Sequence, residues 1–339
     1  MKKILFAVTE DNFPGVITPE VEEQMRALGD VVQRKDLPHK ASEGYDPEEA
    51  YTRAIAEADP EILITAWGTA MLTARAYAAG PNVKYLCHCA GTVRKIVARE
   101  VLEAGLLVTN WGALPARTVA EAALMMTLAA LRKVSGFVRL LDAGGWRTDA
   151  FDGASLFERT VGLQGLGVIA QEFVRLLGPF GCAVSAYSPH CPDDVFERLG
   201  VRRETDLARL YAENDVVSIH ASNTPDNYHI VGREMLDGMK AGAVLVNTAR
   251  GAILDEAALA EKLKEGTIWA ALDVYEEEPL PADSPLRGLR NVLLLPHQGG
   301  PTTDRRKDMG RHALENLRRY IEGEPVTDVV DLRKYDLIT

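Results

Sequence analysis

Three side chains in the C-terminal half of the sequence could together bind an acid and move a proton. Arg250 follows the apolar run at 244–249, His297 follows the run at 292–296, and Glu278 lies between them. A guanidinium can hold a carboxylate through two parallel hydrogen bonds, and an imidazole backed by a carboxylate can give or take a proton near neutral pH. We therefore take these three as the candidate catalytic residues of a site for reducing a 2-oxo acid.

A glycine-rich turn upstream of these residues could bind a molecule that carries the hydride needed for the reduction. The segment 160–170 has the pattern of a strand, a tight turn and the start of a helix, with Gly165 and Gly167 in the turn. These glycines would let the backbone approach a pyrophosphate, while Ala170 replaces the third glycine where the helix packs on the strand. The pattern predicts a dinucleotide site. The alternative is a structural turn that binds nothing.

The residue that follows the next strand bears on the choice between NAD and NADP. An acidic residue there usually accepts hydrogen bonds from the adenosine ribose, but this sequence has Ser188. Loss of the carboxylate removes its repulsion of a 2′-phosphate, which His190, Arg202 or Arg203 could bind. We expect NAD or NADP, with a slight preference for NADP. The alternative is that Ser188 bonds the ribose hydroxyls and the arginines are solvated.

Each of these interpretations has a structural alternative. An arginine after a strand often pairs with a surface acid, and Glu278 has acidic neighbours at 276 and 277 that are typical of a solvated run. Asp273, at the end of another apolar run, could bind the nicotinamide carboxamide or cap the next turn. The remaining histidines are interpreted first as structural: His39, His88, His190, His220, His229 and His312.

Short apolar runs alternate with amphipathic stretches, which is typical of strand–helix units and parallel sheets. A helix at 118–134 and a later one with Pro301 in its first turn are expected, the later one packing on the first domain. The predicted fold is α/β with two doubly wound parallel-sheet domains. A Rossmann dinucleotide-binding domain at 112–300 is inserted into a flavodoxin-like substrate domain made of 1–111 and 301–339. Strands are expected at 4–8, 62–65, 85–89 and 107–109, then at 160–163, 183–187, 216–220, 244–247, 270–273 and 292–295.

The composition is that of a soluble globular protein and argues against several partners. The 339-residue chain carries a net charge of −11 without a basic block, which argues against nucleic acid. The longest apolar stretch, at 119–134, contains charged residues, so we interpret it as a buried helix and expect no membrane partner. The cysteines, Cys87, Cys89, Cys182 and Cys191, lack the spacing of a zinc site or a disulfide framework. We expect reduced thiols, no metal and a cytoplasmic location.

With these motifs in order along nearly its whole length, the sequence resembles the D-isomer-specific 2-hydroxyacid dehydrogenase family. The resemblance implies that Arg250 binds the substrate carboxylate, that Glu278 supports the histidine and that His297 is the acid/base. It also implies a homodimer with a contact at 137–146. The candidate substrate-binding residues are Ala90, Gly91, Thr92, Arg250 and His297. The candidate cofactor-binding residues are Gly165, Gly167, Val168, Ile169, Ser188, Ala221, Ser222, Thr248, Ala249, Asp273 and Gly300, with Thr118 nearby.

Departures from the family pattern leave the substrate open. The loop at 91–95 is one residue shorter than the usual Gly-x-Gly-x-Asp-Asn loop. Its Arg94 could reach a second acidic group of the substrate, or could point to solvent or pair with a neighbouring carboxylate. Trp67 and Trp111 could line the pocket or belong to the core. Two other functions are weighed: a formate dehydrogenase-like enzyme, where glutamine typically replaces Glu278, and a non-catalytic dinucleotide sensor, which could lose the catalytic residues.

Overall fold

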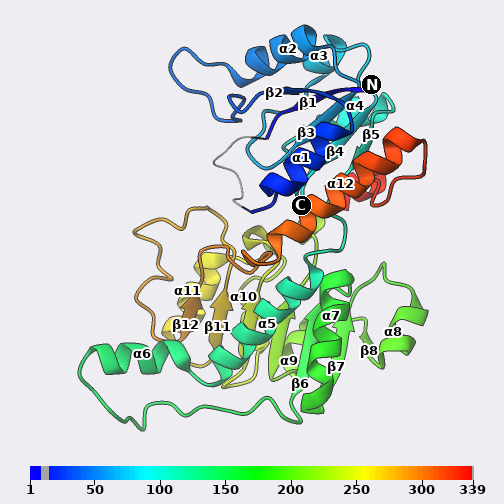
Figure 1. The fold of residues 1–339 in the computed structure, drawn as a ribbon. Helices are drawn as coiled ribbons and strands as arrows, with labels where there is room; N and C mark the ends of the chain where they lie inside the picture. The colour runs from blue at the N-terminus through cyan, green and yellow to red at the C-terminus, as the bar shows by residue number, and fades with distance from the viewer. Residues whose placement is uncertain (9–14, 338–339) are drawn as a thin grey trace. The chain divides into compact units, whose positions relative to one another are not determined.

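The structure is a computed structural model that describes residues 1–8 and 15–337, apart from the side chain of residue 337. The chain forms two compact units (Figure 1): unit 1 comprises Met1–Leu114 and Thr302–Thr339, and unit 2 comprises Pro115–Pro301. Each unit contains one sheet, and its paired strands run parallel. This confirms the predicted α/β class with two parallel sheets. The functional roles of the two units stay predictions.

Unit 1 is a five-stranded sheet with helices on both faces. Helices α1 (Pro19–Ala27) and α12 (Arg306–Glu322) pack on one face, and α2 (Pro47–Ala58), α3 (Ala74–Ala78), α4 (Arg99–Glu103) and α13 (Leu332–Leu337) pack on the other. The strand order is β2-β1-β3-β4-β5, with β1 at Lys3–Phe6, β2 at Asp30–Gln33, β3 at Ile62–Thr65, β4 at Tyr85–His88 and β5 at Leu107–Thr109.

Two sequence expectations for unit 1 were wrong in detail. Strand β2 was not expected, because its sequence Asp-Val-Val-Gln suits an edge strand that is only half-buried. Pro301 is not in the first turn of a helix. Residues 302–305 form a hydrogen-bonded turn first, and α12 begins at Arg306. The packing of α12 on the first sheet is as expected, since Ala313 and Leu317 join the apolar cluster that contains residues of β1 and β3.

Unit 2 is a seven-stranded sheet that is likewise covered on both faces. Helices α5 (Ala116–Leu131), α7 (Val168–Leu177) and α8 (Asp193–Leu199) pack on one face, and α9 (Leu207–Glu213), α10 (Arg233–Gly238) and α11 (Glu256–Lys264) pack on the other. The strand order is β12-β11-β10-β9-β6-β7-β8, with β6 at Thr160–Gln164, β7 at Ala183–Tyr187, β8 at Arg202–Glu204, β9 at Val216–Ile219, β10 at Val244–Asn247, β11 at Trp269–Leu272 and β12 at Val292–Leu294.

Unit 2 also corrects two expectations. Six strands were expected, but β8 adds a seventh at the edge, where its Arg-Arg-Glu sequence stays polar. The single helix expected at 118–134 is two helices. Helix α5 ends at Leu131, and α6 (Val134–Asp142) begins after Lys133, whose φ of 57° lies in the left-handed region and breaks the helix.

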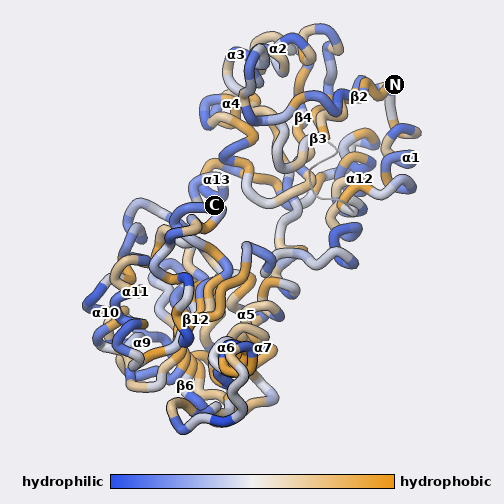
Figure 2. Tube along the Cα trace, turned by 90° about the vertical axis from the view of Figure 1, so that its left-hand side faces the viewer, coloured by the Kyte–Doolittle hydropathy of each residue, from blue (hydrophilic) through white to orange (hydrophobic). Residues whose placement is uncertain are grey.

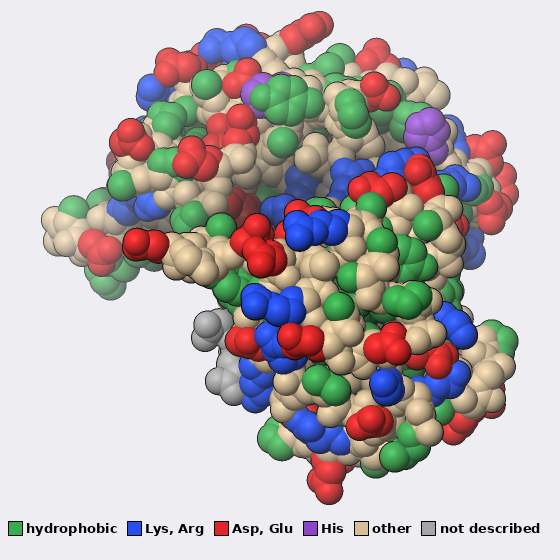
Figure 3. All heavy atoms as spheres, turned by 90° about the horizontal axis from the view of Figure 1, so that it is seen from above, with side chains coloured by type: hydrophobic (Ala, Val, Ile, Leu, Met, Phe, Trp, Pro, Cys, Tyr) green, Lys and Arg blue, Asp and Glu red, His purple; other side chains and the backbone are tan. Residues whose placement is uncertain are grey.

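The hydropathy pattern agrees with this layering. The strands and the inner faces of the helices are hydrophobic in Figure 2, whereas acidic and basic side chains are interspersed on the face drawn in Figure 3. In the part of the chain that the structure describes, no helix combines the length and the apolar character needed to cross a membrane.

Candidate active site

The three candidate catalytic residues follow three neighbouring strands of unit 2. Arg250 comes after β10, Glu278 after β11 and His297 after β12. The sheet order β12-β11-β10 places these strands side by side, and their carboxyl ends meet at one edge because all the pairings are parallel. This edge is where ligands usually bind in open α/β sheets.

His297 and Glu278 form a direct pair. The imidazole Nδ1 lies 2.7 Å from Oε2 of Glu278, and the backbone N–H of Tyr275 donates to Oε1 at 3.1 Å. Burial alone would raise the pKa of Glu278. The hydrogen bonds from His297 and from the Tyr275 N–H, together with the charges of His297 and Arg250, lower that pKa below its ordinary value. The carboxylate therefore stays ionised and orients the imidazole through Nδ1.

The loop that carries His297 is held by Asp273. The backbone N–H of His297 donates to the carbonyl of Asp273 at 2.9 Å, while Gln298 and Gly299 donate their N–H groups to the two carboxylate oxygens at 2.7 and 2.8 Å. His297 itself has a φ of 54°, a strained value for a non-glycine residue. Asp273 thus holds the turn after β12, whereas the turn that it was expected to cap is the one directly after its own strand β11. Its contact with a cofactor stays a prediction.

Arg250 is positioned by two neighbours, Asn247 and Gly251, and sequence reasoning missed the role of Asn247. The side chain of Asn247 donates to the carbonyl of Arg250 at 2.9 Å and accepts from the N–H of Ala249 at 3.0 Å. A Cβ on Gly251 would lie 1.8 Å from the carbonyl carbon of Tyr275, so only glycine allows this close approach. An asparagine at a strand end before a tight turn was the available signal for Asn247. The contact of Gly251 left no local signal.

The Arg250 guanidinium is largely shielded from water. Burial lowers its pKa, and the negative charge of Glu278 opposes this shift. Its Nη1 donates to the carbonyl of Ala249 at 2.6 Å. An arginine stays protonated despite such a shift, because its ordinary pKa is above 12. The site therefore combines a fixed cation with a carboxylate-backed imidazole on one edge of one sheet.

The glycine-rich turn has the geometry of a dinucleotide cradle. Gly165 has a φ of 97°, and a Cβ there would lie 2.8 Å from the backbone nitrogen of Ala221. Gly167 is the N-cap of α7, and a Cβ there would meet no atom within 4 Å, so the space beside the helix start is open. Val168 and Ile169 form the first turn of this ten-residue helix, whose N–H groups and dipole favour a pyrophosphate.

Most of the other candidate cofactor residues lie at the same edge of the sheet. They follow strand ends: Ala221 and Ser222 come after β9, Thr248 and Ala249 after β10, and Gly300 after β12. Thr118 lies in the first turn of α5, where its hydroxyl donates to the carbonyl of Pro115 at 2.9 Å.

The arginines near Ser188 are engaged with protein groups. Arg203 donates to the carbonyls of Ser188 and Cys191 at 3.3 and 2.7 Å and pairs with Asp193 at 2.6 Å. Arg202 pairs with Glu204 at 2.8 Å. These contacts hold the segment after β7 in place. His190, two residues after Ser188, is exposed, so its side chain is still available to a ligand.

The candidate substrate loop of unit 1, Ala90 to Thr92, is packed around its glycine. The side chain of Asn110 donates to the carbonyl of Gly91 at 2.7 Å, and a Cβ on Gly91 would lie 2.7 Å from the ring of Trp111. Trp111 also packs edge to face on Trp67, with ring centroids 4.8 Å apart. Glycine is therefore required at position 91.

Arg94 takes none of the orientations weighed from the sequence. Its Nε donates to the backbone carbonyl of Tyr335 at 2.9 Å, and its Nη2 donates to the carbonyl of Asp336. The guanidinium therefore fastens the 91–95 loop to helix α13 at the end of the chain.

Comparisons with known proteins place this site in a family. The family model described as D-isomer specific 2-hydroxyacid dehydrogenase, NAD binding domain, matches residues 124–299. The D-3-phosphoglycerate dehydrogenase of Methanocaldococcus jannaschii is 36% identical over 275 residues, which is 81% of this chain. The chain belongs to the D-isomer-specific 2-hydroxyacid dehydrogenase family. The resemblance that the motifs predicted is thereby confirmed.

For two other members of the D-isomer-specific 2-hydroxyacid dehydrogenase family, the match covers a larger share of the relative's own length than it does for the M. jannaschii protein. The glyoxylate reductase of Korarchaeum cryptofilum is 34% identical over 265 residues, covering 77% of this chain and 80% of that protein. The crystal structure of a glyoxylate reductase from Paecilomyes thermophila has a TM-score of 0.81 at 26% identity, covering 98% of this chain and 99% of the other. By contrast, the match spans about half, 52%, of the M. jannaschii protein.

Proposed function

We propose that this protein is an NAD(P)-dependent D-2-hydroxyacid dehydrogenase that reduces a small 2-oxo acid. The observation that carries the proposal is the 2.7 Å contact between His297 Nδ1 and the Glu278 carboxylate, at the sheet edge that also presents Arg250. Membership of the family and the open cradle at Gly167 support a nicotinamide dinucleotide as the cofactor. That cofactor would supply the hydride when bound.

In the proposed mechanism, Arg250 binds the substrate carboxylate and so orients the neighbouring ketone. His297, oriented by Glu278, donates a proton from Nε2 to the ketone oxygen as negative charge develops there. The Glu278 carboxylate stabilises the protonated imidazole before the transfer and orients the neutral ring after it. The resemblance to the family supports a second carboxylate contact, from the backbone N–H groups of Ala90, Gly91 and Thr92.

We propose NADPH as the preferred cofactor. The support is chemical. Ser188 stands where the family usually has an acidic residue, so the repulsion of a 2′-phosphate by a carboxylate is absent. His190, two residues further on, is exposed. The test compares the dissociation constants of NADPH and NADH for the wild type and for Ser188→Asp. We expect the substitution to weaken NADPH binding and shift the preference toward NADH. A wild type that binds NADH more tightly would contradict the preference.

The reaction is tested by following NADPH and NADH oxidation against a panel of 2-oxo acids. The names of the relatives suggest glyoxylate, hydroxypyruvate and 3-phosphohydroxypyruvate as first members. We expect His297→Ala to lose turnover far more than cofactor affinity, and Arg250→Ala to lose both turnover and apparent affinity for the acid. Wild-type rates in the His297 variant would overturn the assignment. Tight cofactor binding without reduction of any acid would favour a dinucleotide sensor, and oxidation of formate would favour a formate dehydrogenase.

We also propose a cytoplasmic homodimer with its contact at 137–146. Helix α6 and the residues after it support the contact, because Val138, Leu141 and Trp146 expose 51%, 53% and 78% of their surface. The described cysteines are free thiols, which supports a reducing compartment. Sedimentation of the wild type and of Val138→Glu tests the dimer. A monomeric wild type at micromolar concentration would contradict it.

A further inference from the structure

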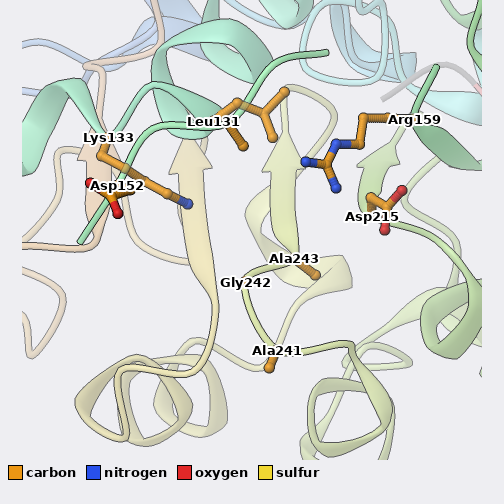
Figure 4. A pocket seen from close by; sticks show the side chains of 9 residues that line it. Leu131, Lys133, Asp152, Arg159, Asp215, Ala241, Gly242 and Ala243 are labelled. Carbon is orange, nitrogen blue, oxygen red and sulfur yellow. The ribbon is translucent and has the colours of Figure 1, made fainter. Parts of the chain in front are cut away.

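A cavity of about 240 Å³ lies within unit 2, at the amino ends of the strands (Figure 4). The candidate active site lies at their carboxyl ends. Its walls include the residues that directly precede three strands: Arg159 before β6, Asp215 before β9 and Ala243 before β10. Lys133, from the break between α5 and α6, lines another side. The proposed function uses none of these residues.

Lys133 is the unusual residue of this cavity. It is only 5% exposed, and its ammonium lies 4.4 Å from the ring centroid of Trp269. Within the described residues, this ammonium forms neither a hydrogen bond nor an ion pair. A largely buried lysine without an anionic partner is costly, and a cation–π contact offsets only part of that cost. The left-handed backbone of Lys133 nevertheless directs its side chain into the cavity (Figure 4).

Arg159 faces the same space with a second positive charge. Its Nε donates to the carbonyl of Ser155 at 3.2 Å, and its guanidinium points into the cavity (Figure 4). Burial, followed by the charge of Arg159, lowers the pKa of Lys133 to about 8. The two cations therefore influence one another across a space that an anion could fill.

The acidic residues of the cavity do not neutralise this pair. The carboxylate of Asp215 is engaged by the ammonium of Lys240 at 3.1 Å and by the hydroxyl and N–H of Thr160, each at 3.0 Å. Asp152 also lines the cavity and is exposed, and among the described residues it forms no ion pair with Lys133. Within residues 1–8 and 15–337, neither carboxylate therefore forms an ion pair with Lys133 or Arg159.

We propose that this cavity binds a small dianion, with phosphate or paired carboxylate groups, between Lys133 and Arg159. The volume is several times the roughly 30 Å³ share of one liquid water, so a phosphate or a short dicarboxylate fits. Charge-assisted hydrogen bonds to the anion would supply the partner that the Lys133 ammonium lacks. Binding would also favour the protonated lysine, so anion binding and proton uptake are linked.

The test is isothermal titration calorimetry at pH 8 with inorganic phosphate in one arm and succinate in the other. Saturating dinucleotide is present, so that the turn at Gly165 and Gly167 is filled. Titrations in Tris and in HEPES, whose ionisation enthalpies differ, report the protons taken up. We expect binding with a net uptake of protons, because burial lowers the pKa of Lys133 toward that pH and the bound anion favours the protonated lysine. The arm with the tighter binding shows which kind of dianion the site prefers.

Three variants locate the site. Lys133→Met replaces the buried ammonium with an apolar chain of similar length, and it should weaken binding at least about tenfold and abolish the proton uptake. Arg159→Gln should weaken binding without abolishing the uptake. Lys264→Met removes an exposed lysine that pairs with Glu261, and it should change neither. No binding of either anion to the wild type, or equal affinity in Lys133→Met, would overturn the proposal. Thermal unfolding confirms that each variant is folded.

Discussion

Glu278→Gln tests whether the carboxylate acts through His297. The substitution keeps the size of the side chain and removes the charge that lies 2.7 Å from the imidazole. A hydrogen bond to a charged group contributes about 1.5–3 kcal/mol. The side chains of His297 and Glu278 are 48% and 36% exposed, so solvent screening reduces this to about 1–2 kcal/mol. At 1.36 kcal/mol per tenfold change, we expect kcat/KM to fall by about 5- to 30-fold.

The pH profile separates this role from general damage to the site. In the wild type the pKa of Glu278 lies below its ordinary value of 4.5, so the carboxylate should cause no acid-side loss of kcat/KM above that pH. In the glutamine variant kcat/KM should be lower at every pH above that value, because the imidazole has lost the carboxylate that orients it. The affinity for the dinucleotide should be unchanged.

Glu277→Gln is the matched control for Glu278→Gln. It removes the same charge from the adjacent residue, which is exposed. We expect its kcat/KM and its pH profile to equal those of the wild type. Equal losses in the two variants would refute the reasoning, because they would show that the acidic run acts through its total charge. An unchanged kcat/KM in Glu278→Gln would refute it as well.

Three further predictions follow from the packing. Gly251→Ala should lower the free energy of unfolding by about 3 kcal/mol, since a Cβ would lie 1.8 Å from a backbone carbon. In the control Gly178→Ala, the added Cβ would meet no atom within 4 Å, so thermal unfolding should show no loss of stability. Gly167→Ala should keep the stability but raise the dinucleotide dissociation constant at least about tenfold in a fluorescence titration, because its methyl group would occupy the space for the pyrophosphate; an unchanged constant would contradict the cradle. Burial lowers the pKa of His88 to about 3, so the unfolded chain takes up the proton first as the pH falls below 6.5. Stability should decline by about 2 kcal/mol between pH 6.5 and 5, and His88→Gln should reduce that slope in urea titrations.

The sequence predicted best the parts of the fold whose signal is local. Strands β3, β5, β7 and β10 have the predicted bounds, because each is a short apolar or β-branched run between turns. Two of the four edge strands, β2 and β8, were missed because an edge strand can stay polar and then lacks the buried pattern. The helix break at Lys133 was also missed, since neither glycine nor proline marks it.

In the candidate site, too, the sequence indicated local features but not contacts between distant residues. The types and order of Arg250, Glu278 and His297 indicated the chemistry, and the structure pairs the last two directly. The contacts that position them lie between distant parts of the chain, as when Gly251 packs on Tyr275. Arg94 is the clearest case, because its partner at Tyr335 is 241 residues away and no local pattern could show it.

The placement of α12 has a consequence for synthesis on the ribosome. Strands β1 to β5 are made first, but Ala313 and Leu317, which cover their buried residues Ile4 and Ile64, are made only after all of unit 2. Domains generally fold as they emerge, so unit 2 can complete its core while one face of the first sheet is covered by α1 but not yet by α12. During that interval the nascent chain presents an apolar surface of the kind that chaperones bind. A substitution that slows the folding of unit 2 would therefore also put the folding of unit 1 at risk, before α12 has covered its sheet.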